Sequence, residues 1–554
     1  MDAVIVGLPG SGKSAIGRRL AGRHGARFVD LDADIEAAAG MPVADIFAVE
    51  GETGFRARER AAIEALGPPD RGPELGRVIA PGGGAVVDPR NRWRLYRGRL
   101  PIWLDVRPEV LAQRLRRSPR VRPLVAGRDP VGALRQLAAA RARFYAPSRR
   151  VNGVAEPEAV LGLVAAEVQN AATDTGTVLL RASTPGGAVV IGEGIAAPEL
   201  ATALRSLSAR RAILISESGA WSAAGASLAA ALTAEGWPVE HLLLPSGEDA
   251  KRMAVVEDAA SQLSRWRVER GEPLVAIGGG AVGDTAGFVA AIYLRGVPLI
   301  QVPTTLVAQI DSSLGGKTGV DLPEGKNLVG AFHQPAAIVI DIALLGSLPE
   351  RERRAGLAEA AKMAALGDER LFELLEEWGP AIAAGDPQAV ESGALAELVE
   401  RAAWAKIEVV TADEREAAGR IALNLGHSLG HAIEAAAGFT ELRHGEAVAY
   451  GLRAACRIGL ARGVTPAARV ARIEALLDRL ELGRGSLPYS PALVLDALAG
   501  DKKHAGGNLR WVLPTGSGYQ VDEGVPDELV ASVAADVLGG RTAGATLDAA
   551  GARS

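Results

Sequence analysis

The first fourteen residues limit the possible fold more than any other stretch of the chain. Residues 3–6 are a short apolar run, and residues 7–14 read GLPGSGKS, which matches the pattern G-x-x-x-x-G-K-[ST]. Glycines in such a loop let backbone N–H groups surround a phosphate, and the helix that follows directs its N-terminus at it. Lys13 is expected to reach the β- and γ-phosphates and Ser14 to hold Mg²⁺. The pattern predicts a strand–loop–helix unit that binds a nucleoside triphosphate through Gly7, Gly10, Ser11, Gly12, Lys13 and Ser14.

Charged residues after this loop indicate what receives the phosphate. Asp30 and Asp32 fall at the end of an expected strand, where α/β sheets place their ligands, although a solvated acidic turn has the same sequence. Residues 78–84, VIAPGGG, predict a strand that enters a glycine loop. Arginine suits carboxylates and phosphates because its guanidinium group is planar and bidentate, but a single arginine is more often a solvated surface residue. The combination with the phosphate loop predicts a small anionic acceptor held by Arg56, Arg122 and Arg141.

Residues 1–170 resemble shikimate kinase. The resemblance rests on GLPGSGKS, FVDLDADIE, the FRxxE run, PGGGA, RPL and the RxxxY run. It implies that ATP and Mg²⁺ bind at the loop with Asp30 near the metal, and that Asp32 orients or deprotonates the attacked hydroxyl of shikimate. It also implies that Arg122 belongs to a mobile lid. Arg56 and Arg141 are implied to hold the shikimate carboxylate, and the backbone of Gly82, Gly83 and Gly84 to lie against its ring.

The pattern of apolar runs divides the rest of the chain into two parts. Residues 212–215, 239–244, 274–277 and 299–302 read as buried strands separated by helical runs, which predicts a parallel, Rossmann-like sheet. Beyond residue 350 amphipathic helices dominate, and the next strand is expected near Trp511. We therefore expect an α/β protein: a P-loop kinase at 1–170, a linker at 171–176, a Rossmann-like part at 177–345, an all-helical part at 346–540 and a disordered tail at 541–554.

Three of the seven histidines fall within residues 421–449. His427 and His431 are four apart on one helical face, and His444 follows a break at Gly438. Catalytic zinc typically takes three protein ligands of mixed histidine and carboxylate type. The histidines alone are also compatible with two helix-face residues and an unrelated third. Glu359, on an earlier helix, is the natural carboxylate to complete a metal site.

Polar groups on both sides of the histidines predict a phosphorylated, hydroxyl-rich substrate and a dinucleotide. Residues 278–284, GGGAVGD, follow a strand and open a helix, where a glycine turn admits a pyrophosphate, although close backbone packing would select the same glycines. The substrate candidates cluster beside glycines and the histidine-rich stretch, although a surface helix could contain any one of them. They include Asp311, Lys317, Lys326, Asn327, Lys362, Lys406, Arg420, Asn424, Lys502 and Lys503.

Residues from about 176 to 540 resemble 3-dehydroquinate synthase through GGGAVGDTAGF, QVPTTLVAQIDSSLGGKTGVDLPEGKN, GLAEAAK, LNLGHSLGHAIE, LRHGEAVA and DKK. The resemblance implies that Zn²⁺ or Co²⁺ is held by Glu359, His427 and His444, and that His431 lies near the substrate phosphate instead. It implies catalytic or substrate contacts by Asp311, Lys317, Asn327, Lys362, Lys406, Arg420, Asn424 and Lys502 or Lys503, with Arg295 reaching in from the second subunit of a homodimer. The implied NAD contacts are Glu248, Lys251, Gly279, Gly280, Asp284, Thr304 and Thr305.

Together the two resemblances predict a bifunctional enzyme of the shikimate pathway. Alternatives are another sugar-phosphate cyclase or a metal-dependent alcohol dehydrogenase in the C-terminal part, and a non-catalytic nucleotide sensor in the N-terminal part. The net charge of −5 gives no basic field for nucleic acid, and we expect no membrane segment. One cysteine and the lack of a recognisable signal peptide lead us to expect a cytoplasmic protein with small-molecule substrates.

Overall fold

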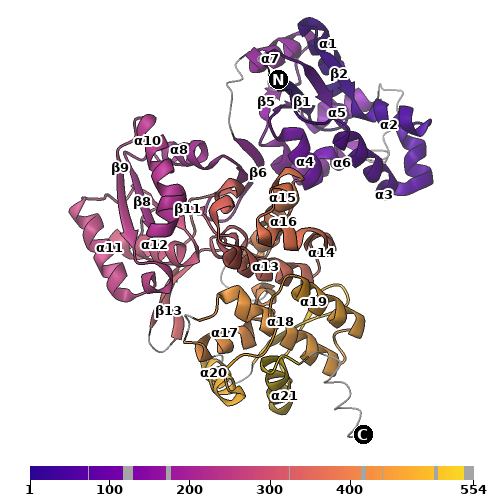
Figure 1. Cartoon of the computed structure of the whole chain (residues 1–554). Coiled ribbons are helices and arrows are strands. Elements are labelled where there is room, and N and C mark those ends of the chain that lie inside the picture. The colour runs from indigo at the N-terminus through magenta and orange to yellow at the C-terminus, as the bar shows by residue number, and fades with distance from the viewer. Residues whose placement is uncertain are drawn as a thin grey trace. The chain divides into compact units, whose positions relative to one another are not determined.

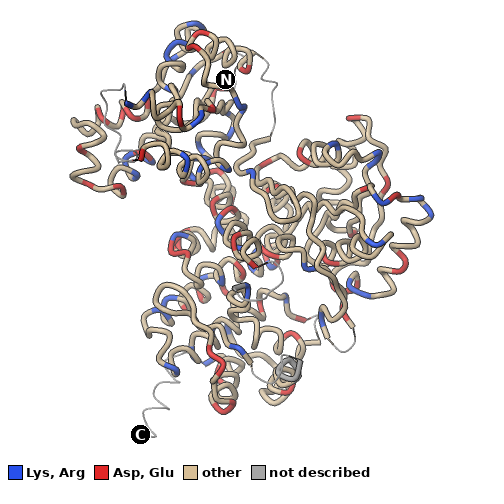
Figure 2. The backbone as a smooth tube through the Cα atoms, turned by 180° about the vertical axis from the view of Figure 1, so that it is seen from behind, with Lys and Arg blue, Asp and Glu red and all other residues tan. Residues whose placement is uncertain are grey.

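The computed structural model describes residues 1–70, 72, 74–116, 129–169, 176–322, 325–413, 419–438, 441–504 and 509–541. The chain divides into two compact units (Figure 1). The first unit comprises Met1–Ala182 and Val190–Ile195, and the second comprises Ser183–Val189 and Ala196–Ser554. Figure 2 shows acidic and basic positions interspersed along the described parts of both units. No helix among the described residues is long and apolar enough to cross a membrane.

The first unit is built on a five-stranded parallel sheet in the order β2-β3-β1-β4-β5. The central strand β1 is buried along its whole length, and its apolar residues pack with Leu20 and Val164 of the flanking helices. The strands are β1 (Asp2–Val6), β2 (Arg27–Asp30), β3 (Arg77–Ala80), β4 (Leu100–Asp105) and β5 (Arg149–Asn152). The helices are α1 (Lys13–His24), α2 (Leu31–Ala39), α3 (Val43–Glu64), α4 (Pro89–Tyr96), α5 (Pro108–Arg116), α6 (Pro130–Tyr145) and α7 (Pro157–Gln169).

Because the strands are parallel, their carboxyl ends meet at one edge of the sheet. The phosphate loop leaves β1 at this edge, the acidic run leaves β2 and the glycine loop leaves β3. The strand–loop–helix arrangement predicted around residues 3–14 is therefore confirmed, and the three predicted segments share one edge.

The second unit begins its α/β part with strands that match the predicted apolar runs. The strands that lie wholly in this unit run in the order β14-β11-β10-β8-β9, and neighbouring strands in this order pair in parallel. Their bounds are β8 (Ala212–Glu217), β9 (Val239–Leu244), β10 (Leu274–Gly278), β11 (Leu299–Pro303) and β14 (Ala337–Asp341), preceded in the chain by β6 (Thr177–Ser183) and β7 (Ala188–Glu193). The helices are α8 (Ala196–Ser206), α9 (Ser218–Ala220), α10 (Ala226–Ala234), α11 (Met253–Arg265) and α12 (Gly280–Ile292).

An antiparallel hairpin interrupts the α/β alternation, and the sequence pattern did not predict it. Strand β12 (Lys317–Leu322) pairs with β13 (Gly325–Phe332), with Lys317 opposite Phe332 and Gly319 opposite Gly330. Its residues are glycine-rich and polar, so they lack the alternation that identifies a strand in sequence. The hairpin packs on α12, and Val320 enters the core there.

The remainder of the second unit is mainly helical, as predicted, and includes the strand expected near Trp511 within a small antiparallel pair. Helix α18 is buried along most of its length and packs on α13, α17, α19 and α21. The helices are α13 (Glu350–Ala365), α14 (Glu369–Ala384), α15 (Pro387–Glu391), α16 (Ala394–Ala412), α17 (His427–Ala436), α18 (His444–Ala461), α19 (Ala467–Arg479), α20 (Pro491–His504) and α21 (Asp527–Leu538). The pair is β15 (Trp511–Pro514) with β16 (Tyr519–Asp522).

Candidate active sites

The phosphate loop of the first unit has the backbone that its glycines predict. Gly7, Gly10 and Gly12 have φ values of 146°, 83° and 97°, a region that side chains other than glycine rarely adopt. A Cβ atom at Gly7 would also lie 2.8 Å from the carbonyl oxygen of Leu104. Helix α1 begins directly after Gly12, and Lys13 Nζ donates to the Gly7 carbonyl at 3.0 Å. The loop therefore places a helix N-terminus and a lysine ammonium group at one anion site.

The glycine loop after β3 lies against the residues predicted to hold the acceptor. A Cβ atom at Gly82 would lie 2.9 Å from Asp32 Oδ1, and one at Gly84 would lie within 2.9 Å of the Arg56 guanidinium group. Arg141, which is buried, donates from NH1 to the Gly83 carbonyl at 2.9 Å. Only glycine leaves room for these contacts, so backbone, carboxylate and guanidinium groups can face one small ligand.

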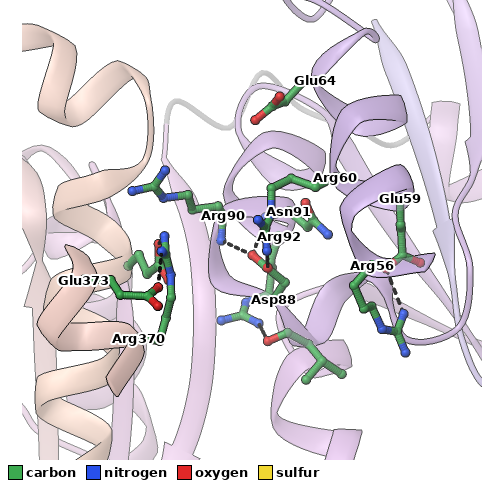
Figure 3. A network of polar contacts seen from close by, with 12 residues as sticks. Arg56, Glu59, Arg60, Glu64, Asp88, Arg90, Asn91, Arg92, Arg370 and Glu373 are labelled. Carbon is green, nitrogen blue, oxygen red and sulfur yellow. Dashed lines mark hydrogen bonds and ion pairs between the residues drawn. The ribbon is translucent and has the colours of Figure 1, made fainter. Parts of the chain in front are cut away.

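Glu59 lies beside these predicted acceptor-binding residues, although its role was not predicted. Its side chain is 1% exposed, and Oε2 accepts from Arg56 NH1 at 2.8 Å (Figure 3). Burial raises the pKa of Glu59, against the opposing charge of Arg56. Glu59 fixes the guanidinium group from one turn further along α3. Asp30 caps α2 through a hydrogen bond from Ala33 N at 3.4 Å, and Arg122 lies outside the described residues.

In the second unit, the residues predicted to bind NAD gather at the carboxyl edge of β10 and β11. Gly279 caps α12, and a Cβ atom there would lie 3.0 Å from Thr305 Cγ2. The backbone N–H of Thr304 donates to the carbonyl of the residue that ends β10, at 2.9 Å. Lys251 Nζ lies 2.8 Å from Asp284 Oδ2. The glycine turn, the threonine turn and the Lys251–Asp284 ion pair thus lie at the carboxyl edge of this sheet. Gly280 and Glu248 belong to the same edge.

Hairpin residues extend this edge. Lys251 Nζ also donates to Asn327 Oδ1 on β13, where Asn327 has a left-handed φ of 56°. Lys326 Nζ lies 3.2 Å from Glu248 Oε1 and 3.1 Å from Glu434 Oε1. The hairpin that the sequence pattern missed therefore supplies two of the predicted polar residues to the site.

A cluster of cations lies almost fully out of solvent beside these residues. Lys406 Nζ is 2.7 Å and Lys362 Nζ is 3.8 Å from Asp311 Oδ1. Burial lowers the pKa of Lys406, and Lys362 adds to this effect while Asp311 opposes it. The buried Arg420 guanidinium group donates to the Gly315 carbonyl at 3.4 Å. The two lysine ammonium groups beside the Asp311 carboxylate, together with the buried Arg420 guanidinium group, favour an anionic ligand.

Three metal-ligand side chains converge next to this cluster. Glu359 lies on α13, and His427 and His444 are the first residues of α17 and α18. Nε2 of His427 is 3.6 Å and Nε2 of His444 is 3.3 Å from Oε1 of Glu359. Ligand atoms of all three lie within 4.8 Å of one another. Oε2 of the buried Glu359 pairs with Nζ of Lys362, and Oε1 faces both histidine rings, so this donor set fits a cation such as Zn²⁺ or Co²⁺.

The charges around the three ligands also favour a divalent cation. Burial opposes ionisation of Glu359, but Lys362 and the two histidines hold its pKa well below the ordinary value. Burial also opposes protonation of His444, yet hydrogen bonds to Glu359 and Glu434 raise its pKa to about 10. A divalent cation would take the place of this proton, because a metal-bound imidazole must be neutral.

Each histidine ligand is oriented by a partner on its second nitrogen. Nδ1 of His427 lies 3.2 Å from the Leu425 carbonyl, and Nδ1 of His444 lies 3.1 Å from Glu434 Oε2. Such partners leave Nε2 available as a ligand. Sequence reasoning gave Glu434 no role, although it lies three residues after His431 on the same helix. His431, Glu434 and His444 also lie within 4.8 Å of one another, but Glu434 there is already engaged by Lys326.

Helix packing through glycines brings the ligands together. A Cβ atom at Gly445 would lie 1.9 Å from the Ala355 carbonyl of α13, and one at Gly451 would lie 1.8 Å from the Gly426 carbonyl. The start of α18 therefore approaches α13 backbone to backbone, which places His444 within reach of Glu359.

Several other predicted residues have more exposed side chains. His431 is exposed, with its ring centroid 5.2 Å from that of His427 and 5.8 Å from that of His444. Lys317, Asn424 and Arg295 are also exposed. The side chains of Lys502 and Lys503 on α20 are outside the described residues, as are residues 171–175 of the predicted linker and 542–554 of the predicted tail.

Fold and site geometry define two classes of enzyme in one chain: a P-loop phosphotransferase, and an α/β-plus-helical enzyme with a histidine–carboxylate metal site. The family model described as shikimate kinase matches residues 9–165, and those for the N-terminal and C-terminal parts of 3-dehydroquinate synthase match 241–355 and 356–504. A 3-dehydroquinate synthase from Symbiobacterium thermophilum is 44% identical over 337 residues, which are 60% of this chain and 92% of that protein.

Two solved structures of other synthases are also similar to this chain. A 2-epi-5-epi-valiolone synthase from Streptomyces hygroscopicus, with NAD⁺ and Zn²⁺ bound, is 31% identical with a TM-score of 0.59, over 64% of this chain and 98% of that one. A 2-deoxy-scyllo-inosose synthase complexed with carbaglucose-6-phosphate, NAD⁺ and Co²⁺ is 26% identical with a TM-score of 0.57, over 64% and 99%. The chain belongs to the 3-dehydroquinate synthase family and has a shikimate kinase domain fused at its N-terminal side.

Proposed function

We propose that the second unit converts 3-deoxy-D-arabino-heptulosonate 7-phosphate into 3-dehydroquinate and phosphate with bound NAD and Zn²⁺ or Co²⁺. The first unit would phosphorylate the 3-hydroxyl of shikimate with ATP and Mg²⁺. The observation that supports the synthase reaction best is the set Glu359, His427 and His444 beside the buried Lys362–Asp311–Lys406 cluster. The identity of 44% to a 3-dehydroquinate synthase, against 31% and 26% to two other cyclases, favours this substrate.

In this proposal Glu359, His427 and His444 hold the metal. When bound, the metal would polarise a substrate hydroxyl, and NAD would accept and later return a hydride, so the cofactor would not be consumed. Lys406 and Arg420 would neutralise anionic groups of the substrate inside a buried site, where charge interactions are strong. Asp311 would keep the two lysine side chains in place between ligands.

The test measures phosphate release from the heptulosonate phosphate by the purified full chain. We expect release that needs the metal, that depends on NAD, and that proceeds without accumulation of NADH at 340 nm. Steady NADH accumulation would instead indicate a metal-dependent alcohol dehydrogenase. Release from another sugar phosphate, with none from the heptulosonate, would indicate a different cyclase.

For the first unit, the proposal rests on the contacts around Gly82, Gly83 and Gly84. Arg56 and Arg141 would hold the shikimate carboxylate, and Asp32 would face the attacked hydroxyl. Lys13 and Ser14 would serve ATP and Mg²⁺, with Asp30 near the metal. The test is ATP-dependent formation of shikimate 3-phosphate; tight ATP binding without turnover would favour a nucleotide sensor.

We also propose that the second unit forms a homodimer in which Arg295 reaches the neighbouring active site. Arg295 is exposed and follows Leu294, and both have left-handed φ values, of 67° and 50°. Ile292, Leu294 and Phe332 are apolar side chains that are 44%, 40% and 49% exposed, and contact with a second copy would cover such side chains. Light scattering tests the dimer, and restoration of activity on mixing Arg295→Ala with an inactive metal-site variant tests the shared site.

A further inference from the structure

Glu434 uses its two carboxylate oxygens for two different parts of the second unit. Oε2 lies 3.1 Å from Nδ1 of His444, and Oε1 lies 3.1 Å from Nζ of Lys326. The side chain is 2% exposed, so both contacts are made away from bulk water. A hydrogen bond to an ionised group in such surroundings is shorter and stronger than one between neutral groups.

The contact with His444 decides which imidazole nitrogen can bind a metal. Because Nδ1–H donates to Glu434, Nε2 is the nitrogen left to bind a metal, and it lies 3.3 Å from Glu359 Oε1. His427 obtains the same orientation from a backbone carbonyl. The Leu425 carbonyl is fixed by the chain, whereas Glu434 is a side chain whose position depends on its other partner.

That other partner, Lys326, connects the helical part with the α/β part. Lys326 lies on β13, and its ammonium group is shared between Glu434 and Glu248 Oε1 at 3.2 Å. Glu248 belongs to the turn at Gly247–Ala250, directly before Lys251 at the edge proposed for NAD. A cofactor hydroxyl that engaged Glu248 would weaken the Lys326–Glu248 contact and leave more of the Lys326 charge to Glu434.

We propose that Glu434 is a positioning residue that orients His444 toward the metal and, through Lys326, couples metal binding to NAD binding. This inference rests on the proposed function of the second unit. The coupling is positive, because a Glu248 engaged by the cofactor strengthens the Lys326–Glu434 contact and so holds His444 in place. By thermodynamic linkage, NAD and metal tighten one another by the same factor, about 5-fold or more.

The first experiment compares zinc affinity of full-length variants by competition with a chelator of known affinity. Glu434→Met keeps the side-chain length but removes the acceptor, and we expect zinc to bind about 10- to 100-fold more weakly. Glu434→Gln keeps an oxygen that can accept from Nδ1–H, so it should recover part of the loss. Glu408→Met, at an exposed position on α16, is the matched control. Thermal unfolding verifies that each variant is folded.

The second experiment repeats the zinc titration with saturating NAD⁺. Wild type should bind zinc more tightly with NAD⁺, and Lys326→Met should lose this gain while still binding zinc alone. The inference would be overturned by unchanged zinc affinity in Glu434→Met, or by equal losses of zinc affinity in Glu434→Met and Glu434→Gln. It would also be overturned if Lys326→Met still bound zinc more tightly with NAD⁺ than without it. A wild-type chain that binds zinc and NAD⁺ but shows no phosphate release would refute the proposed reaction and leave the inference about Glu434 intact.

Discussion

Substituting Gly445 by alanine should destroy the metal site of the second unit without unfolding the first. The new Cβ atom would lie 1.9 Å from the Ala355 carbonyl oxygen, whereas real Cβ contacts essentially never fall below 3.0 Å. The start of α18 must therefore move away from α13 by about 1.1 Å. His444 is the adjacent residue, and metal–ligand distances tolerate only about 0.2 Å of error.

We expect Gly445→Ala to weaken zinc binding by more than about 100-fold, since one of three protein ligands is displaced. The overpacking itself should lower the free energy of unfolding of the second unit by about 1–3 kcal/mol. The assay is chelator competition for zinc together with calorimetry. Phosphorylation of shikimate by the same sample reports that the first unit is intact.

The matched control is Gly346→Ala, because a Cβ atom there has no neighbour within 4 Å and the residue is exposed. This variant should bind zinc as wild type does. If Gly445→Ala also kept wild-type zinc affinity, the α13–α18 backbone contact would not be what positions His444, and the reasoning would be refuted.

Three further predictions concern single side chains and the metal. Asp32→Ala should lower kcat for shikimate phosphorylation by about 10²- to 10⁴-fold and leave the Kd for ATP unchanged; unaltered turnover would remove Asp32 from the reaction. Lys406→Met should lower kcat/KM for phosphate release by about 10- to 100-fold, because a buried charged hydrogen bond is lost, and a smaller effect would contradict the anion role. Removal of the metal, followed by addition of Mg²⁺ alone, should abolish phosphate release but not shikimate phosphorylation.

The buried thiol offers a prediction that does not depend on either reaction. Burial raises the pKa of Cys456 to about 12, so the thiol stays protonated at pH 8, and only a thiolate reacts with disulfide reagents. The folded chain should therefore show no fast thiol reaction, and the denatured chain should show one thiol per chain. A fast reaction in the folded state would mean that α18 opens readily.

The parts of the fold that could be predicted from sequence are those with strong local patterns. Strands β8, β10 and β11 are apolar runs of five or six residues, and His427 and His444 stand at helix starts marked by glycine. The hairpin β12–β13 escaped prediction because Gly319 and Gly330 face each other where alternating side chains would be expected. Its strands are defined by pairing with each other and by packing on α12.

The predicted site residues came from motifs, and the unpredicted ones depend on contacts between distant segments. The HxxxH spacing alone pointed to His431 as a ligand, whereas the structure places Glu359 Oε1 3.6 Å from Nε2 of His427 and 3.3 Å from Nε2 of His444. Glu434 and Lys326 are 108 residues apart, so no local pattern could pair them. An i, i+3 spacing of His431 and Glu434 was the only local hint.

The register of the β12–β13 hairpin has a consequence for how this chain tolerates insertions and deletions. A Cβ atom at Gly330 would lie 2.2 Å from the Thr318 carbonyl, so side chains cannot enter where the two glycines face each other. A slip of one residue would bring a larger residue into that position. It would also turn the side chains of Lys326 and Asn327 each to the face of the hairpin opposite to the one that it now occupies. Hairpins usually accept changes in length at their ends. Here a one-residue change within β13 would act on cofactor and metal sites together, so the length of this strand should vary less among working variants than that of ordinary surface loops.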